Sequence, residues 1–271
     1  MDRTLHFFHY QKASLHYSKL GNGSKALFCF HGFGFTGALF YPFEELFSEE
    51  YTIYNFDLFF HGKSTWSFGE IPIEEEFWAK LITEFCKENT IVTFSLLAYS
   101  IGARPVWSIT NKIPEKVKGI IAIAPDGITN SLWYRLATGT IFSRYLFKIL
   151  LSSKIYINIF LTIGMFLKIM PEVTVRYARS QLRTKEQRNR VYLTWVVYRK
   201  LKSNHKLLSE NINNYAIPLT IYLGEYDKII RYSLLKPLLE KVKTKTIITL
   251  KAGHLNLLKK VQEYLSTKNK S

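Results

Sequence analysis

Residues 97–103 (LAYSIGA) place a serine at position 100 between two small residues, each two positions away. The segment follows an apolar run that predicts a strand and begins a pattern that predicts a helix. A serine on such a tight strand-to-helix turn exposes its hydroxyl, and the turn needs small neighbours, a requirement that Ala98 and Gly102 meet. Ser100 is therefore a candidate nucleophile, and a plain helix N-cap serine is the alternative interpretation.

Two backbone amides are candidates for an oxyanion site beside this serine. The Ile101 N–H lies at the predicted helix N-terminus, where unpaired donors and the helix dipole favour negative charge. The second amide belongs to residues 31–34 (HGFG), which directly follow the apolar run at 26–30. Glycines let a backbone approach a substrate closely, so we expect the Phe33 N–H to be the second donor. An ordinary glycine-rich loop is the alternative.

An acid and a histidine end the last two predicted strands. Asp227 follows the run at 218–224, and His254, which lies 27 residues later, follows the run at 246–250. Because the carboxyl ends of parallel strands meet at one edge of a sheet, we expect both side chains to lie beside Ser100. A histidine can take the proton of a serine hydroxyl, and a carboxylate can orient the imidazole. Asp126, which follows another predicted strand, is the alternative acid.

Taken in this order, the motifs resemble those of the α/β-hydrolase family. Besides the HG pair at 31–32, the serine turn, the acid and the histidine, residues 57–64 (DLFFHGKS) look like the family's D-x-x-G-H-G-x-S turn. The resemblance spans nearly the whole chain. It implies a Ser100 nucleophile, a His254 general base, an Asp227 acid and an oxyanion hole formed by the amides of Phe33 and Ile101.

The sequence departs from the family pattern at two positions. Ala98 replaces the first glycine of G-x-S-x-G, which is sterically tolerable, and Phe60 replaces a glycine, from which we expect a slightly reshaped turn. Position 100 is serine, which disfavours the chemistry of the haloalkane dehalogenases and epoxide hydrolases of this family, whose nucleophile is aspartate. Asp57 and His61 could titrate, but the simpler interpretation is a turn that orders its own loop.

The elements that must position these residues alternate along the chain. Short aromatic and β-branched runs at 26–30, 51–56, 91–98, 117–124, 218–224 and 246–250 predict strands, helical spacing at 73–88 and 101–111 predicts helices, and residues 5–19 predict a strand or hairpin. Near-continuous apolar strands separated by helices indicate a parallel sheet covered on both faces. We expect an α/β fold with a mostly parallel central sheet flanked by helices, whose core comprises residues 1–127 and 210–271.

Residues 128–209 interrupt this alternation and predict an inserted helical cap. They contain 15 lysines and arginines against 2 acids, so they supply most of the chain's net charge of +16. The apolar run at 155–167 is 13 residues long, short of the roughly 20 needed to cross a bilayer. The functional interpretation is a lid with an apolar channel for an acyl group, whose cations attract an anionic headgroup or a membrane surface. We favour the simpler interpretation, a helical cap whose apolar faces pack on the main domain and whose cations are merely solvated, because long basic side chains commonly cover apolar surface.

Composition excludes several classes of protein. At 271 residues and 47% hydrophobic content the chain can bury a large core, and only two cysteines, Cys29 and Cys86, make a disulfide framework or a cysteine metal cluster unexpected. The N-terminal residues lack the pattern of a signal peptide, so we expect a cytoplasmic protein. Peripheral attachment to a membrane is compatible with this location. No nucleic-acid module is recognisable, and we expect no nucleic-acid partner. The oligomeric state is left open.

The leading hypothesis is a serine hydrolase that cleaves a carboxylic ester or thioester without metal or cofactor, with an apolar, anionic acyl compound as its small-molecule substrate. Residues 99–104 (YSIGAR) also resemble the Y-S-x-G-x-R string of the menaquinone-pathway lyase, so a lyase or carbon–carbon hydrolase is an alternative. A non-catalytic ligand or membrane receptor on the same fold is another. His31, Tyr99 and Arg104 are the candidates for substrate contact.

Overall fold

The computed structural model describes residues 5–130, 132–170 and 172–268, and the chain divides into two compact units. Unit 1 comprises Met1–Gly69, Glu74–Thr129 and Leu201–Ser271, and unit 2 comprises Glu70–Ile73 and Asn130–Lys200. Unit 2 differs from the 128–209 insertion expected from the sequence. Residues 201–209 belong to unit 1 because the helix that they enter packs on a unit 1 helix, and a short segment at 70–73 joins unit 2.

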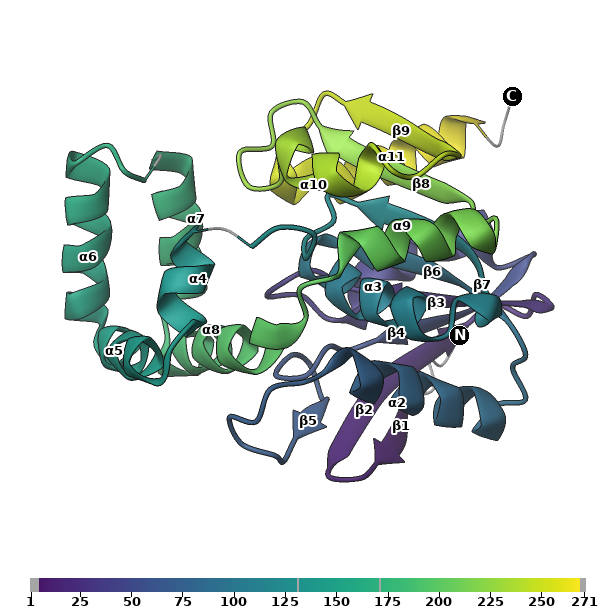
Figure 1. Ribbon diagram of the computed structural model, residues 1–271, viewed down its shortest axis with the longest axis horizontal. Coiled ribbons are helices and arrows are strands. Elements are labelled where there is room, and N and C mark those ends of the chain that lie inside the picture. The colour runs from purple at the N-terminus through teal and green to yellow at the C-terminus, as the bar shows by residue number, and fades with distance from the viewer. Residues whose placement is uncertain (1–4, 131, 171, 269–271) are drawn as a thin grey trace. The chain divides into compact units, whose positions relative to one another are not determined.

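Unit 1 is built on a nine-stranded sheet (Figure 1). Its strand order is β1-β2-β4-β3-β6-β7-β8-β9, with the short β5 paired to β2. The first two strands form an antiparallel hairpin, and β2 is antiparallel to β4. The remaining neighbours in this order, β4, β3, β6, β7, β8 and β9, pair in parallel. The strands are β1 (Leu5–Tyr10), β2 (Ala13–Leu20), β3 (Lys25–Phe30), β4 (Tyr51–Phe56), β5 (Thr65–Trp66), β6 (Phe94–Tyr99), β7 (Val117–Ile123), β8 (Leu219–Gly224) and β9 (Lys245–Leu250).

Helices cover both faces of this sheet. On one face α2, α3, α9 and α10 pack in series (Figure 1). On the other face η1 and α11 are joined by a hydrogen bond from the Gln262 amide to the Pro42 carbonyl (3.0 Å). The helices of unit 1 are η1 (Gly37–Phe43), α1 (Glu44–Phe47), α2 (Glu75–Glu88), η2 (Ser100–Gly102), α3 (Ala103–Lys112), η3 (Pro114–Lys116), α9 (His205–Asn214), α10 (Tyr232–Leu239) and α11 (His254–Lys268). This arrangement confirms the predicted α/β fold with a mostly parallel sheet between helices.

Element ends shift slightly from the sequence prediction. The strand expected at 91–98 begins only at Phe94, because Ile91 donates its N–H to the Cys86 carbonyl (2.8 Å) and Val92 is 76% exposed. The helix expected at 73–88 begins at Glu75, since Ile73 uses its N–H to bond the Val197 carbonyl of unit 2 (2.9 Å).

The core between the sheet and α2 is aromatic. Phe85 of α2 is fully buried, and five rings lie around it with centroid distances of 5.1 to 5.6 Å, all close to edge-on: Phe8, Tyr17, Phe28, Tyr54 and Phe56. Edge-to-face packing places the positive rim of one ring on the negative face of the next and adds to the stabilisation from burial.

Unit 2 consists of helices. They are α4 (Leu132–Thr138), α5 (Ile141–Ser152), α6 (Lys154–Phe166), α7 (Glu172–Gln181), α8 (Lys185–Val197) and η4 (Tyr198–Lys200). Thr140 and Thr184 begin α5 and α8 with reciprocal capping boxes, and the Ser153 hydroxyl caps α6. Within the unit α5 packs on α4, α6 and α8, and α7 packs on α6 and α8.

No single helix among the described residues has both the length and the apolar composition of a membrane span. The consecutive helices α5 and α6 meet that description only when taken together, and they are bent by 108° at Ser153.

We predict that Phe85→Ala destabilises the protein by about 3–5 kcal/mol, since it removes a fully buried ring and leaves a cavity among five others. Chemical denaturation followed by circular dichroism measures the loss. Val92→Ala removes an exposed apolar side chain and is the control, with an expected change within about 0.5 kcal/mol. Equal effects of the two substitutions would contradict this account of the core.

Candidate active site

The site residues expected from the sequence follow the carboxyl ends of parallel strands in unit 1. His31 follows β3, Asp57 follows β4, Ser100 follows β6, Asp126 comes after β7, Asp227 comes after β8 and His254 comes after β9. Since these strands are neighbours in one sheet and run in the same direction, their ends meet at one edge, where open α/β sheets bind ligands.

The turn at Ser100 is sharp and strained. Ser100 has φ +53°, a left-handed conformation that non-glycine residues seldom adopt. A side chain at Gly102 would place its Cβ 2.0 Å from the Phe30 carbonyl oxygen of β3, so only glycine fits there. The close approach of the turn to β3 therefore explains the small residue two positions after the serine.

Ser100, His254 and Asp227 form a continuous chain of hydrogen bonds. The His254 Nδ1 lies 2.7 Å from Asp227 Oδ2, and its Nε2 lies 3.1 Å from Ser100 Oγ. A carboxylate can only accept, so Nδ1 carries the ring proton and Nε2 presents a lone pair to the serine hydroxyl. The other oxygen of Asp227 accepts the N–H groups of Ile229 and Ile230 (2.8 and 2.9 Å), which hold the carboxylate in this orientation.

Tyr99 also holds the histidine in place. Its ring stacks on the His254 imidazole with centroids 5.4 Å apart, and its hydroxyl donates to the His254 carbonyl oxygen (2.7 Å). The side chain is 2% exposed. Tyr99 is therefore a positioning residue in this structure, and nothing in its position beside Ser100 in the sequence indicated this contact.

The loop after β3 runs directly beside the serine turn. A Cβ at Gly32 would lie 2.6 Å from the Tyr99 ring and 3.5 Å from Ser100 Cβ. His31, fully buried, accepts the Leu58 N–H at Nε2 (2.9 Å), so its Nδ1 carries the proton and donates to the Gly32 carbonyl (2.7 Å). This histidine fastens two loops together.

Asp126, the alternative acid, has another partner. Its carboxylate accepts from Arg104 Nε (2.7 Å), while the Arg104 Nη1 donates to the Leu201 carbonyl (3.3 Å). Its backbone N–H bonds the Ser100 carbonyl oxygen (3.0 Å), so it lies close to the turn without meeting His254. Arg104 is 2% exposed. His31, Tyr99 and Arg104, the candidates for substrate contact, are all buried and hydrogen-bonded within the protein.

Asp57 holds the turn at residues 57–64 through several hydrogen bonds, in line with the simpler interpretation of this motif. One carboxylate oxygen accepts the Gly37 N–H (2.7 Å), and the other bonds the Lys63 N–H (2.9 Å) and His16 Nδ1 (2.7 Å). The sequence analysis missed His16, which lies on β2. Phe60 has φ +69°, so the turn keeps a conformation suited to glycine and phenylalanine bears the steric cost.

Neither cysteine competes with Ser100 as a nucleophile. Cys29 and Cys86 are free and buried, and burial raises the pKa of the Cys29 thiol well above its usual range and that of Cys86 to about 12. Both groups therefore stay protonated near neutral pH. Among the described residues no group of three or more histidine, cysteine or acidic side chains is placed to hold a metal ion.

A family model for the alpha/beta hydrolase fold matches residues 25–261. The chain belongs to the α/β-hydrolase family. This α/β hydrolase also resembles many solved structures, among them a hydrolase from Pseudomonas aeruginosa (TM-score 0.70, 16% identity, 98% of this chain and 97% of the other). It also resembles an esterase from Thermogutta terrifontis (TM-score 0.69, 13% identity, 100% of this chain and 97% of the other). A third similar structure is a membrane phospholipase A described as a bacterial virulence factor (TM-score 0.67, 16% identity, 99% of this chain and 85% of the other). No curated protein sequence matches the chain.

We expect opposite effects from substitutions of Asp227 and Asp126 in this α/β hydrolase. Asp227→Asn replaces a carboxylate that can only accept from His254 Nδ1 with an amide that can also donate, which permits the wrong tautomer of His254, so we expect the kcat for an ester substrate to fall by about 10⁴ with little loss of stability. Asp126→Asn weakens the pair with buried Arg104, so we expect a lower melting temperature and a nearly unchanged kcat. Ester hydrolysis and thermal unfolding measure the two quantities. A larger loss of kcat in Asp126→Asn would reverse the assignment of the acid.

Proposed function

We propose that the protein is a serine hydrolase that cleaves a carboxylic ester or thioester through an acyl-enzyme on Ser100. The observation that carries the proposal is the chain of contacts from Ser100 Oγ through His254 to Asp227, at a serine with φ +53°. The backbone strain at this serine supports the same reading, because strained residues concentrate at functional sites. The esterases among the similar structures agree with it at the level of the fold.

The proton transfers of the reaction assign a role to each of the three residues. A serine hydroxyl is a weak nucleophile near neutral pH, so His254 Nε2 accepts its proton as Oγ attacks the carbonyl carbon. Asp227 stabilises the imidazolium that forms and keeps the ring oriented. His254 then protonates the leaving alcohol or thiol, and a water molecule, deprotonated by the same nitrogen, hydrolyses the acyl-enzyme.

Charge on the carbonyl oxygen needs donors that are already in place. The Ile101 amide lies in the first turn of the helical segment Ser100–Gly102, and the Phe33 amide belongs to the loop that approaches the serine at Gly32. We assign the oxyanion hole to these two amides. Loss of one such donor typically slows the reaction by about a hundredfold or more.

We favour hydrolysis over the lyase alternative. It rested on Arg104 as a cation for an anionic substrate, and Arg104 instead pairs with Asp126 in the interior. Hydrolysis by the three residues above uses only water as co-substrate, and the substrate class is a small acyl compound.

The decisive experiment treats the wild-type protein and Ser100→Ala with a fluorophosphonate probe and measures intact mass. We expect one adduct in the wild type and none in the variant, because only an activated serine attacks the phosphorus atom. A panel of p-nitrophenyl esters of increasing acyl length measures turnover in parallel. Ser100→Ala should lower kcat by roughly 10⁶.

Ser108→Ala is the matched control, since Ser108 is a buried serine of α3 whose hydroxyl donates to the Arg104 carbonyl (2.9 Å). It should retain both labelling and turnover. An unlabelled wild type without turnover would reject the hydrolase proposal in favour of a non-catalytic receptor. Labelling without ester turnover would instead favour a carbon–carbon hydrolase.

A further inference from the structure

Two helices of unit 2 direct apolar side chains into solvent. On α5 the exposed residues are Ile141, Phe142, Tyr145, Leu146 and Ile149, with exposed fractions of 41 to 81%. On α6 they are Ile155, Tyr156, Ile159, Phe160 and Ile163, with fractions of 38 to 68%. Both sets follow the spacing i, i+1, i+4, i+5, i+8, which places each set on one face of its helix.

Little of these faces takes part in the packing of unit 2: Phe160 meets the edge of the Trp133 ring of α4 (centroids 6.1 Å apart) and is still 38% exposed. Among the described side chains α5 buries only Leu151, and α6 buries a narrow seam of Ile157, Leu161 and Gly164. A helix that is apolar all round is usually buried. Apart from this ring contact, the exposed faces of α5 and α6 have no apolar partner among the described residues, although such helices normally have one.

The charge of this region has one sign. No aspartate or glutamate occurs between Asp126 and Glu172, whereas five cations do: Arg135, Arg144, Lys148, Lys154 and Lys168. Lys148 pairs with Glu70 of the same unit (2.9 Å). An apolar face flanked by lysine and arginine matches the interface of an anionic bilayer, in which acyl chains lie beneath phosphate groups.

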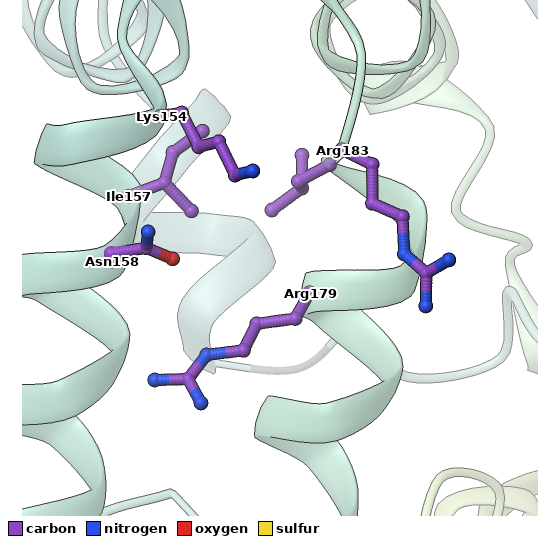
Figure 2. Close-up of a pocket in the computed structure, with 6 residues that line it drawn as sticks. Lys154, Ile157, Asn158, Arg179 and Arg183 are labelled. Atoms are coloured by element: carbon purple, nitrogen blue, oxygen red, sulfur yellow. The ribbon is translucent and has the colours of Figure 1, made fainter.

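A cationic pocket lies within the same unit (Figure 2). It has a volume of about 260 Å³ and is lined by Lys154, Ile157, Asn158, Arg179, Leu182 and Arg183. Figure 2 shows the side chains of Lys154 and Arg179 reaching into the space between α6 and α7. Among the residues that the structure describes, no carboxylate forms a salt bridge with the three cations that line the pocket, Lys154, Arg179 and Arg183. Arg179 donates to the Thr162 hydroxyl (3.1 Å).

We propose that unit 2 docks on the surface of an anionic phospholipid bilayer, with the exposed faces of α5 and α6 at the level of the acyl chains and the Lys154–Arg179 pocket on a lipid phosphate. Lysine and arginine supply several donors to a phosphate oxygen, and the pocket's apolar members, Ile157 and Leu182, suit the stem of a lipid headgroup. This interaction surface goes beyond the proposed function and does not depend on Ser100.

A span or a second copy of the chain fits less well. The two helices have 12 and 13 residues and bend by 108°, with Lys154 next to the bend, so neither crosses the roughly 30 Å hydrocarbon layer alone. Two copies that met through these faces would bring together segments without a single acid, and like charges would repel.

Sedimentation of the full chain with vesicles tests the apolar part. We expect at least about tenfold stronger binding to vesicles containing phosphatidylglycerol than to phosphatidylcholine alone, weakened by added salt. Phe142→Asp and Ile155→Asp should each weaken binding by about tenfold, since they put a charge where apolar area enters the interface. Both substitutions lie in first turns of helices, where an acid suits the helix dipole and folding is preserved. Val92→Asp, at a 76% exposed site of unit 1, is the matched control.

The pocket is tested by Lys154→Gln/Arg179→Gln, which should remove most of the phosphatidylglycerol preference, against the charge-matched Lys243→Gln/Lys259→Gln, which should keep it. The proposal would be overturned if the helix and pocket variants bound vesicles as strongly as the wild type. It would also be overturned if the bound protein resisted alkaline extraction, as a membrane span does, or if the chain formed a dimer that Phe142→Asp dissociated. Ser100→Ala should bind vesicles like the wild type. A failure of ester hydrolysis therefore leaves this test intact, and a failure to bind vesicles leaves the hydrolase test intact.

Discussion

The close approach of the Ser100 turn to strand β3 is the constraint on which the site depends. Ser100 is held at φ +53° and the Cβ position of Gly102 falls 2.0 Å from the Phe30 carbonyl oxygen, so the first turn of the following helix rests on the neighbouring strand. Such strain costs on the order of 1–3 kcal/mol and persists only where the surroundings determine it. Here the parallel pairing of β3 with β6 and the burial of both strands do so.

Two buried polar networks extend this constraint to the neighbouring strand ends. Asp227 and Tyr99 hold the His254 ring and backbone, and Asp57 ties the loops after β3 and β4 through backbone N–H groups. In both networks a carboxylate is saturated by donors at fixed positions, which restricts its orientation before any substrate arrives. A preorganised site of this kind loses little energy to reorganisation during the reaction.

The two units use the same apolar residue types differently. Unit 1 packs its aromatic rings around Phe85, whereas α5 and α6 of unit 2 leave Phe142, Tyr145 and Phe160 exposed beside lysines and arginines. The negative charges of the chain are also unequally divided, since none lies between residues 127 and 171. The proposed catalytic residues and the proposed membrane-binding surface thus lie in separate parts of one sequence.

The sequence alone determined the alternation of strands and helices and the residues at the strand ends, because periodicity and the turn at Ser100 are local properties. It also showed that Phe60 and Ala98 stand where the motifs that the chain resembles have glycine. Only the tertiary structure decided that Asp227 meets His254 while Asp126 pairs with Arg104, since both acids follow parallel strands and their partners lie 22 to 27 residues away. Exposure of α5 and α6 was likewise undecided, because an apolar pattern does not say which face finds a partner.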